Sequence, residues 1–143
     1  MKKSKLFKQI SLKTGFMKHN GGLFFKKISD NKFEFKTKIN RNHLNAAGIT
    51  HGGYLAAIID AGAGTSAHQS ANNSPCVTIS LDLKFIGASK LGDEILGKTK
   101  ILKKTSTLIF LFCELSCNKK IIASASGIWK IIKIKPSSFG PGG

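Results

Sequence analysis

The sequence is poor in acidic residues, in arginine and in long apolar runs, and these shortages narrow the classes of protein to which it can belong. The 143-residue chain has 7 acidic against 23 basic residues, and its formal net charge is +16 at pH 7. No run of about 18 apolar residues occurs, so we expect no transmembrane helix. The basic start is not followed by the continuous apolar segment of a signal peptide, and we therefore expect a cytoplasmic protein.

Cysteine is scarce as well, with 3 residues and no Cys-x-x-Cys pair. Cys76, Cys113 and Cys117 lie in or beside apolar runs. This placement is typical of reduced thiols used as small core residues, and it argues against metal or redox chemistry. We expect no metal site and no cofactor other than a coenzyme that belongs to the substrate.

The excess of positive charge raises the question of nucleic-acid binding. Arg41 is the one arginine among the 23 basic residues, whereas proteins that read bases and phosphates rely on the bidentate guanidinium fork. The lysines are scattered, and no basic patch interleaved with aromatic residues is visible along the chain. We therefore expect a polyanionic small ligand, with no nucleic acid and no membrane as partner, and keep a nucleic-acid-binding domain as the less favoured alternative.

Apolar periodicity predicts one α+β domain with a single long helix. Residues 32–39 alternate with a period of two, which is typical of a half-buried strand. A helix without helical neighbours needs another layer to cover it, so the sheet should wrap around it. We divide the chain into a basic segment with a helical turn or two at 1–21, a domain at 22–134 and a tail at 135–143. Strands are expected at 23–28, 32–39, 77–85, 93–104, 107–117 and 119–134.

The helix is expected from about residue 52 to 68, after the sequence THGG, with Thr50 or His51 as its cap. Its core-facing stripe is Leu55, Ile58, Ile59, Ala63 and Ser66. In the strand 77–85, the alternation assigns Ile79, Leu81, Leu83 and Phe85 to one face and Thr78, Ser80, Asp82 and Lys84 to the other.

Asp60 is an unusual residue for the middle of this helix. Burying an ionised carboxylate without a partner costs far more than its packing returns. Ala56, Ala57, Ala63 and Gly64, one turn away, are all small and leave space beside the carboxylate. A reactive acid facing a substrate fits this arrangement, and a core acid paired with a lysine is the alternative.

The pattern Asn45-x5-His51-Gly52-Gly53-x6-Asp60, followed by TISLDLKF and KLGD, resembles the hotdog-fold acyl-CoA thioesterases. The likeness is greatest to the phenylacetic-acid-pathway type and the small thioesterase-superfamily members, and it covers roughly residues 22–134. It implies a hotdog fold, in which a five- to six-stranded antiparallel sheet wraps one long central helix. It also implies an enzyme that hydrolyses acyl-CoA to a free acid and CoA.

The resemblance assigns roles to five residues. The Gly52 amide and the Asn45 side chain would polarise the thioester carbonyl, since N–H groups at a helix N-terminus stabilise an oxyanion. Asp60 would activate water or attack directly, and Thr78 would place the water. His51 would position the substrate or ease departure of the thiolate. Each has a structural alternative, because His51 could only cap the helix and Asn45 could only make an Asx turn.

Coenzyme A carries a diphosphate and a 3′-phosphate, so its site needs cations. By resemblance, this site includes the sequence FIGASK at 85–90 and the turn at 103–106. Many relatives have Arg-Pro where this chain has Gly87 and Ala88, a departure that affects the pantetheine and phosphate contacts. The residues expected to bind substrate or CoA are Gly53, Ser80, Phe85, Gly87, Lys90, Lys103, Lys104, Thr105, Ser106 and Lys130.

Helix geometry adds an inference of its own. Nine residues separate His51 from Asp60, which corresponds to about 13 Å of rise and about two and a half turns. The two side chains should lie on opposite faces of one helix, so a single chain cannot bring both to one thioester. Two antiparallel copies can, and we expect a homodimer or a dimer of dimers. The sequence leaves open the acyl group, water against covalent attack, and a non-catalytic acyl-CoA-binding role.

Overall fold

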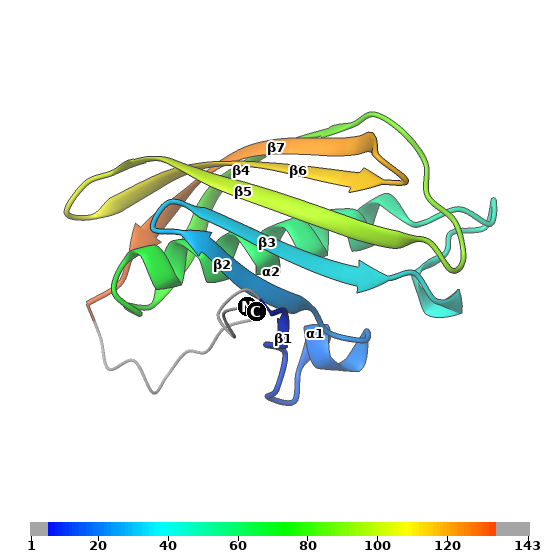
Figure 1. Cartoon of the computed structure of the whole chain (residues 1–143), viewed down its shortest axis with the longest axis horizontal. Helices are drawn as coiled ribbons and strands as arrows, with labels where there is room; N and C mark the ends of the chain where they lie inside the picture. The colour runs from blue at the N-terminus through cyan, green and yellow to red at the C-terminus, as the bar shows by residue number, and fades with distance from the viewer. Residues whose placement is uncertain (1–5, 134–143) are drawn as a thin grey trace.

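The computed structural model describes residues 6–133, so the expected tail at 135–143 lies outside the described residues. The long helix α2 (Gly52–Ser70) lies along one face of a seven-stranded antiparallel sheet with the order β1-β2-β3-β5-β6-β7-β4 (Figure 1). The remaining elements are α1 (Phe16–His19), η2 (Arg41–His43), β1 (Lys8–Gln9), β2 (Phe24–Ser29), β3 (Lys32–Lys38), β4 (Cys76–Phe85), β5 (Glu94–Lys104), β6 (Leu108–Cys117) and β7 (Lys120–Ile131).

The predicted α+β hotdog architecture is confirmed, with a small difference in strand number. All six expected strands form, and the seventh is β1, which pairs with β2 through Lys8 and Phe25. A strand of two residues is too short to show a period-two pattern, so this edge strand could not be predicted from the sequence.

The core lies between α2 and the concave face of the sheet. On β3, Phe33 and Phe35 are 1% and 0% exposed, as the alternation predicts. The helical stripe is also confirmed, since Ile58 and Ile59 are fully buried. The polar member of that stripe, Ser66, is satisfied by a hydrogen bond of 2.7 Å between its Oγ and the Oγ1 of Thr99.

The ring of Phe35 fixes how closely α2 approaches the sheet. It lies between Gly62 of α2 and Gly97 of β5, and a Cβ atom at either glycine would overlap it. Because the ring is fully buried, it has little room to move aside. The two glycines therefore allow the helix and the sheet to pack against one aromatic side chain.

We expect Gly62→Ala and Gly64→Ala to have opposite effects on stability. Both replace a helical glycine and gain up to about 1 kcal/mol of helix propensity. At Gly64 the methyl group would stand 3.4 Å from Trp129 Nε1, an ordinary contact, whereas at Gly62 it overlaps Phe35. Overpacking typically costs about 1–3 kcal/mol. Urea unfolding should show Gly62→Ala destabilised and Gly64→Ala unchanged or stabilised, and equal midpoints would contradict this account of the packing.

A bulge in β4 corrects the predicted faces of that strand. Thr78 pairs with Trp129 and Ser80 pairs with Ile128, so Ile79 has no partner on β7 and is 54% exposed. The extra residue turns Thr78 toward α2, on the same face as the later residues Leu81 and Leu83. The assignment of Thr78 to the face opposite Leu81 was therefore wrong, because a regular alternation cannot anticipate an inserted residue.

Candidate active site

The N-terminus of α2 presents one open backbone donor. His51 is the N-cap, and its Nδ1 accepts a hydrogen bond of 2.7 Å from the Gly53 N–H. The Gly52 N–H has no acceptor among the described residues. Gly53, expected to contact substrate, thus has its amide occupied by His51, and Gly52 has the N–H that can meet an oxyanion at the positive end of the helix.

Asn45 lies in the loop that leads into α2 and uses its side chain in two ways. Its Oδ1 accepts hydrogen bonds from the N–H groups of Ala47 at 2.9 Å and Ile49 at 3.3 Å. This is the Asx turn that the sequence left open as an alternative. The Nδ2 group has no partner among residues 6–133, so the turn fixes the side chain and leaves an amide donor available.

Asp60 and Thr78 meet, as the resemblance implied. The Oγ1 of Thr78 donates a hydrogen bond of 2.6 Å to the Oδ1 of Asp60. Both residues are exposed in the single chain, and no ion pair is formed by Asp60 in the described part of the chain. The β4 bulge is what brings the hydroxyl to the helix, and the second carboxylate oxygen of Asp60 remains available.

Phe85 and the loop after it extend the site around the start of α2. A Cβ atom at Gly52 would stand 3.4 Å from the Phe85 ring, so this ring covers the glycine. The loop is fastened to the helix entry by two hydrogen bonds, from Thr50 N–H to the Ser89 carbonyl at 2.9 Å and between the two hydroxyl groups at 2.7 Å.

Beside this loop is a pocket of about 530 Å³. Gly87 and Lys90, both expected to bind CoA, line it together with Lys120, the first residue of β7. Its apolar lining consists of Ile49, Ile86, Ile121 and Ile122. Asp93 also lines the pocket, and its Oδ2 accepts a hydrogen bond of 2.9 Å from the Lys90 N–H. A pocket with an apolar wall, two lysines and one such carboxylate can accept an elongated ligand with a charged end.

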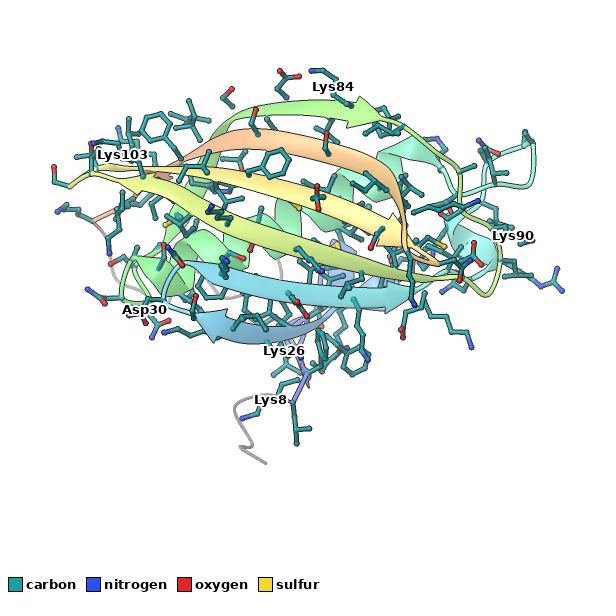
Figure 2. The ribbon with its side chains drawn as sticks, turned by 45° about the horizontal axis from the view of Figure 1, so that its top comes forward. Lys8, Lys26, Asp30, Lys84, Lys90 and Lys103 are labelled. Carbon is teal, nitrogen blue, oxygen red and sulfur yellow. The ribbon has the colours of Figure 1, made fainter. Side chains whose placement is uncertain are left out.

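The other expected CoA-binding residues lie away from this pocket in the same chain. Figure 2 shows Lys103 and Lys90 at opposite ends of the sheet. Lys104 Nζ donates a hydrogen bond of 2.6 Å to the Ser70 carbonyl, at the C-terminus of α2. Thr105 Oγ1 accepts from the Leu108 N–H at 2.9 Å and stabilises the β5–β6 turn, where Ser106 is exposed. Ser80 and Lys130 are on the face of the sheet turned away from α2.

The cysteines are placed as small core residues. Burial raises the pKa of Cys76 to about 11 and also raises the pKa of Cys113. For Cys117, burial and the nearby Asp93 carboxylate raise the pKa of the thiol. All three thiols are therefore protonated and unreactive near neutral pH. Over residues 6–133, no three metal-binding side chains gather, and no helix has the length and apolar character to span a bilayer.

The sequence model of one protein family, the thioesterase superfamily, matches residues 47–122 of the chain. The chain belongs to this superfamily. Thioester hydrolysis is therefore the class of reaction of this chain, and the matched region contains the helix entry, Asp60 and Thr78.

Individual relatives agree with this assignment. A Pseudomonas aeruginosa protein named "Putative esterase PA0474" is 29% identical over 112 residues, which cover 78% of this chain and 84% of the relative. Human acyl-coenzyme A thioesterase 13 is 28% identical over 79 residues, or 55% of this chain and 56% of the relative. The match to the human thioesterase therefore spans about half of its length.

Solved structures show the same fold. Zebrafish thioesterase superfamily member 2 superposes with a TM-score of 0.77 and 24% identity, over 85% of this chain and 90% of that one. A Streptococcus pneumoniae protein described as a hypothetical thioesterase, solved with coenzyme A, superposes with a TM-score of 0.71 and 20% identity, over 87% and 94% of the two chains. At these identities the likeness shows the hotdog fold.

Sequence reasoning missed several residues of this thioesterase's pocket. Ile49, Asn118, Lys120 and Ile122 line it but come from two segments far apart in the chain. Asn118 has a φ of 51°, which is typical of an asparagine in a tight turn. The turn itself could be predicted from the sequence. The position of this turn beside the 86–90 loop, however, depends on the order of the strands in the sheet.

Proposed function

We propose that the protein hydrolyses acyl-CoA thioesters to a free acid and CoA in a site shared by two copies of the chain. The hydrogen bond of 2.6 Å between Thr78 Oγ1 and Asp60 Oδ1 is the observation that carries the proposal. This hydrogen bond orients the Asp60 carboxylate, which belongs to the same helix whose N-terminus has the open Gly52 N–H.

Each group has a step to perform. The Gly52 N–H and Asn45 Nδ2 donate hydrogen bonds to the thioester carbonyl oxygen, which becomes an oxyanion when water attacks the carbon. The free oxygen of Asp60 accepts a proton from that water. Thr78 Oγ1, which donates its hydrogen to Asp60, accepts a hydrogen bond from the same water. The tetrahedral intermediate then collapses, the C–S bond breaks, and the thiolate of CoA leaves and takes up a proton.

His51 is suited to assist the leaving group. Because Nδ1 accepts from the Gly53 N–H, the neutral imidazole carries its hydrogen on Nε2. That Nε2–H is a donor at the same end of α2 as Gly52. It can therefore stabilise negative charge on the departing sulfur while Nδ1 keeps the helix capped.

A shared site is supported by the free edge of the sheet. β4 is the terminal strand of the sheet order, and no strand of residues 6–133 lies on its outer side. Ile79, Phe85 and Ile86, on and just after this edge, are 54%, 58% and 59% exposed. A long edge strand with exposed apolar residues is prone to pair with another chain. Two β4 strands paired about a two-fold axis would lay two α2 helices side by side, so that Asp60 of one could face Gly52 of the other.

The same arrangement accounts for the separated lysines. Lys90 lies near the start of α2 and Lys103 near its C-terminal end, so one CoA could meet both only if they come from different chains. The Streptococcus pneumoniae structure shows that this fold accommodates coenzyme A. A panel of aryl, short-chain and long-chain acyl-CoAs, assayed with a thiol-detecting dye, tests the proposal directly. Tight binding with no thiol release from any of them would favour a non-catalytic acyl-CoA-binding protein.

Replacing the phosphate-binding lysines should raise KM and leave kcat nearly unchanged. For Lys90→Gln combined with Lys103→Gln we expect a rise in KM of about 3- to 10-fold, since exposed charge pairs contribute about 1 kcal/mol or less each. We expect kcat to be unchanged because the lysines would bind the CoA phosphates equally well in the ground state and in the transition state. Lys104 is left intact because its Nζ binds the Ser70 carbonyl.

Two controls accompany this prediction. Lys27→Gln removes a lysine that is paired with Asp30, away from the proposed site, and should change nothing. Acyl-pantetheine, which lacks the diphosphate and the 3′-phosphate, should be hydrolysed equally by the wild type and the double variant. Equal loss with both substrates would mean that these lysines support the fold instead.

A further inference from the structure

The loop between β4 and β5 contains one buried residue, and that residue is polar. From residue 86 to residue 92 every position is exposed except Ser89, which is 3% exposed. The loop before α2 repeats the pattern, because Thr50 is 5% exposed although residues 46–49 and His51 are all exposed. Buried polar groups are almost always hydrogen-bonded, and these two are found together.

The two buried hydroxyl groups bind each other. Ser89 Oγ donates a hydrogen bond of 2.7 Å to Thr50 Oγ1, and the Thr50 N–H donates one of 2.9 Å to the Ser89 carbonyl. We name this double link the Thr50–Ser89 clamp. Two apolar side chains of similar size would fill the same space at about the same stability. The hydroxyl pair adds direction, because one hydrogen bond lets two segments pivot about it and a second bond fixes their orientation.

The clamp is the hydrogen-bonded connection between the 86–90 loop and the entry to α2. The ends of the loop are tied elsewhere, by two N–H groups that donate to the Ile122 carbonyl at 2.8 and 3.0 Å and by the Lys90 N–H that donates to Asp93 Oδ2 at 2.9 Å. Within residues 6–133, no other hydrogen bond joins this loop to the helix entry. The orientation of the loop relative to α2 therefore depends on the clamp.

Each partner in the clamp is followed directly by residues of the proposed site. Lys90 comes after Ser89 and lines the pocket beside the loop. Its ammonium group forms no ion pair in the described part of the chain, so the charge is available to a ligand. His51 and Gly52 come after Thr50. The clamp thus fixes how a cation lies relative to the N–H group that would meet the thioester carbonyl.

We propose that the Thr50–Ser89 clamp positions Lys90 for the phosphates of CoA and thereby gives the site a preference for CoA over shorter thioesters. This inference rests on the proposed hydrolysis of acyl-CoA. Coenzyme A is long, and its phosphates lie many bonds from the thioester. A lysine whose loop is already oriented therefore binds with a smaller loss of conformational entropy than a lysine on a pivoting loop. Ser89 and Thr50 are positioning residues, since they act through Lys90.

Ser89→Ala is expected to raise KM for acyl-CoA by about 2- to 5-fold and to leave kcat within about 2-fold, because a pivoting loop can lose at most the contribution of one exposed lysine. The Kd of free CoA, measured by calorimetric titration, should rise by the same factor. Thr50→Val replaces the hydroxyl by a methyl group and should have the same effect, whereas Thr50→Ser keeps the hydroxyl and should match the wild type. Acyl-pantetheine, which has no phosphates for Lys90 to bind, should be hydrolysed alike by all four proteins.

Two further variants separate positioning from stability. With Lys90→Gln already present, Ser89→Ala should not change KM again, because both residues act through one contact. Ser66→Ala is the matched control, since Ser66 and Thr99 are equally buried and their hydroxyl groups are also 2.7 Å apart, but they join α2 to β5 in the core. It should lower the urea midpoint about as much as Ser89→Ala and leave KM and Kd at their wild-type values.

The possible outcomes distinguish the clamp from the proposed hydrolysis. Wild-type KM and Kd in folded Ser89→Ala and Thr50→Val would overturn the clamp and leave hydrolysis standing. Equal losses with acyl-CoA and acyl-pantetheine, or a further rise in KM on top of Lys90→Gln, would also overturn it, because Ser89 would then act by another route. CoA binding without hydrolysis would contradict the proposed function alone, since Kd still tests the clamp. A wild type that does not bind CoA would overturn both.

Discussion

Asp60→Asn is expected to lower kcat for acyl-CoA hydrolysis by at least about 10²-fold, since it removes the group that accepts the proton from water. The amide keeps the size of the carboxylate and can still accept the hydrogen bond from Thr78, so the local structure should persist. Substrate binding should survive, because the carboxylate acts mainly in the transition state. Steady-state kinetics together with calorimetric titration of the variant with acyl-CoA separates the two effects.

The matched control is Asp82→Asn. Asp82 lies on the same strand as Thr78, but it faces away from α2 and is paired with Lys84. Its amide variant should retain turnover close to that of the wild type. Near-normal turnover in Asp60→Asn would remove Asp60 from the mechanism, even if the enzyme proved to be an active thioesterase.

Mixing two inactive variants should restore activity if each site takes residues from two chains. Asn45→Asp preserves the Oδ1 acceptor of the Asx turn but replaces the Nδ2 donor, and Asp60→Asn removes the base. When the two are unfolded and refolded together, about half of the dimers are mixed, because a two-fold interface pairs identical patches. One of the two sites in each mixed dimer is then intact. Activity should recover to about a quarter of the wild-type value.

The control is a chain that carries both Asn45→Asp and Asp60→Asn, refolded with an equal amount of wild type. A shared site again predicts about a quarter of the wild-type activity, since only the wild-type homodimers are intact. A site contained in one chain predicts about half in this mixture and none in the first. Native mass spectrometry of the mixed species shows that exchange has taken place, so an absence of recovery would exclude the shared site.

Features that depend on near neighbours could be predicted from the sequence. The start of α2, its buried stripe and the cap at His51 follow from residues within a few positions of one another. Asn45, His51 and Gly52 gather for the same reason, because all three belong to the loop and first turn of one helix.

Features that depend on distant pairing could not be predicted in the same way. The sequence TISLDLKF alternates regularly, so nothing in it marks Ile79 as an extra residue. The contact between Thr78 and Asp60 was expected from the resemblance alone. The pocket beside Lys90 assembles from segments whose adjacency is decided by the order of the strands.

The bulge at Ile79 divides β4 into two parts that have different structural roles. Residues 76–78 hold the hydroxyl that contacts Asp60, while in residues 80–85 Leu81 and Leu83 pack against the core and Phe85 lies at the helix start. Because the inserted residue absorbs changes in register and twist between them, side chains in the second part can be exchanged without moving the hydroxyl. Substrate preference can therefore diverge within this architecture, or be redesigned, while the reacting groups stay where they are.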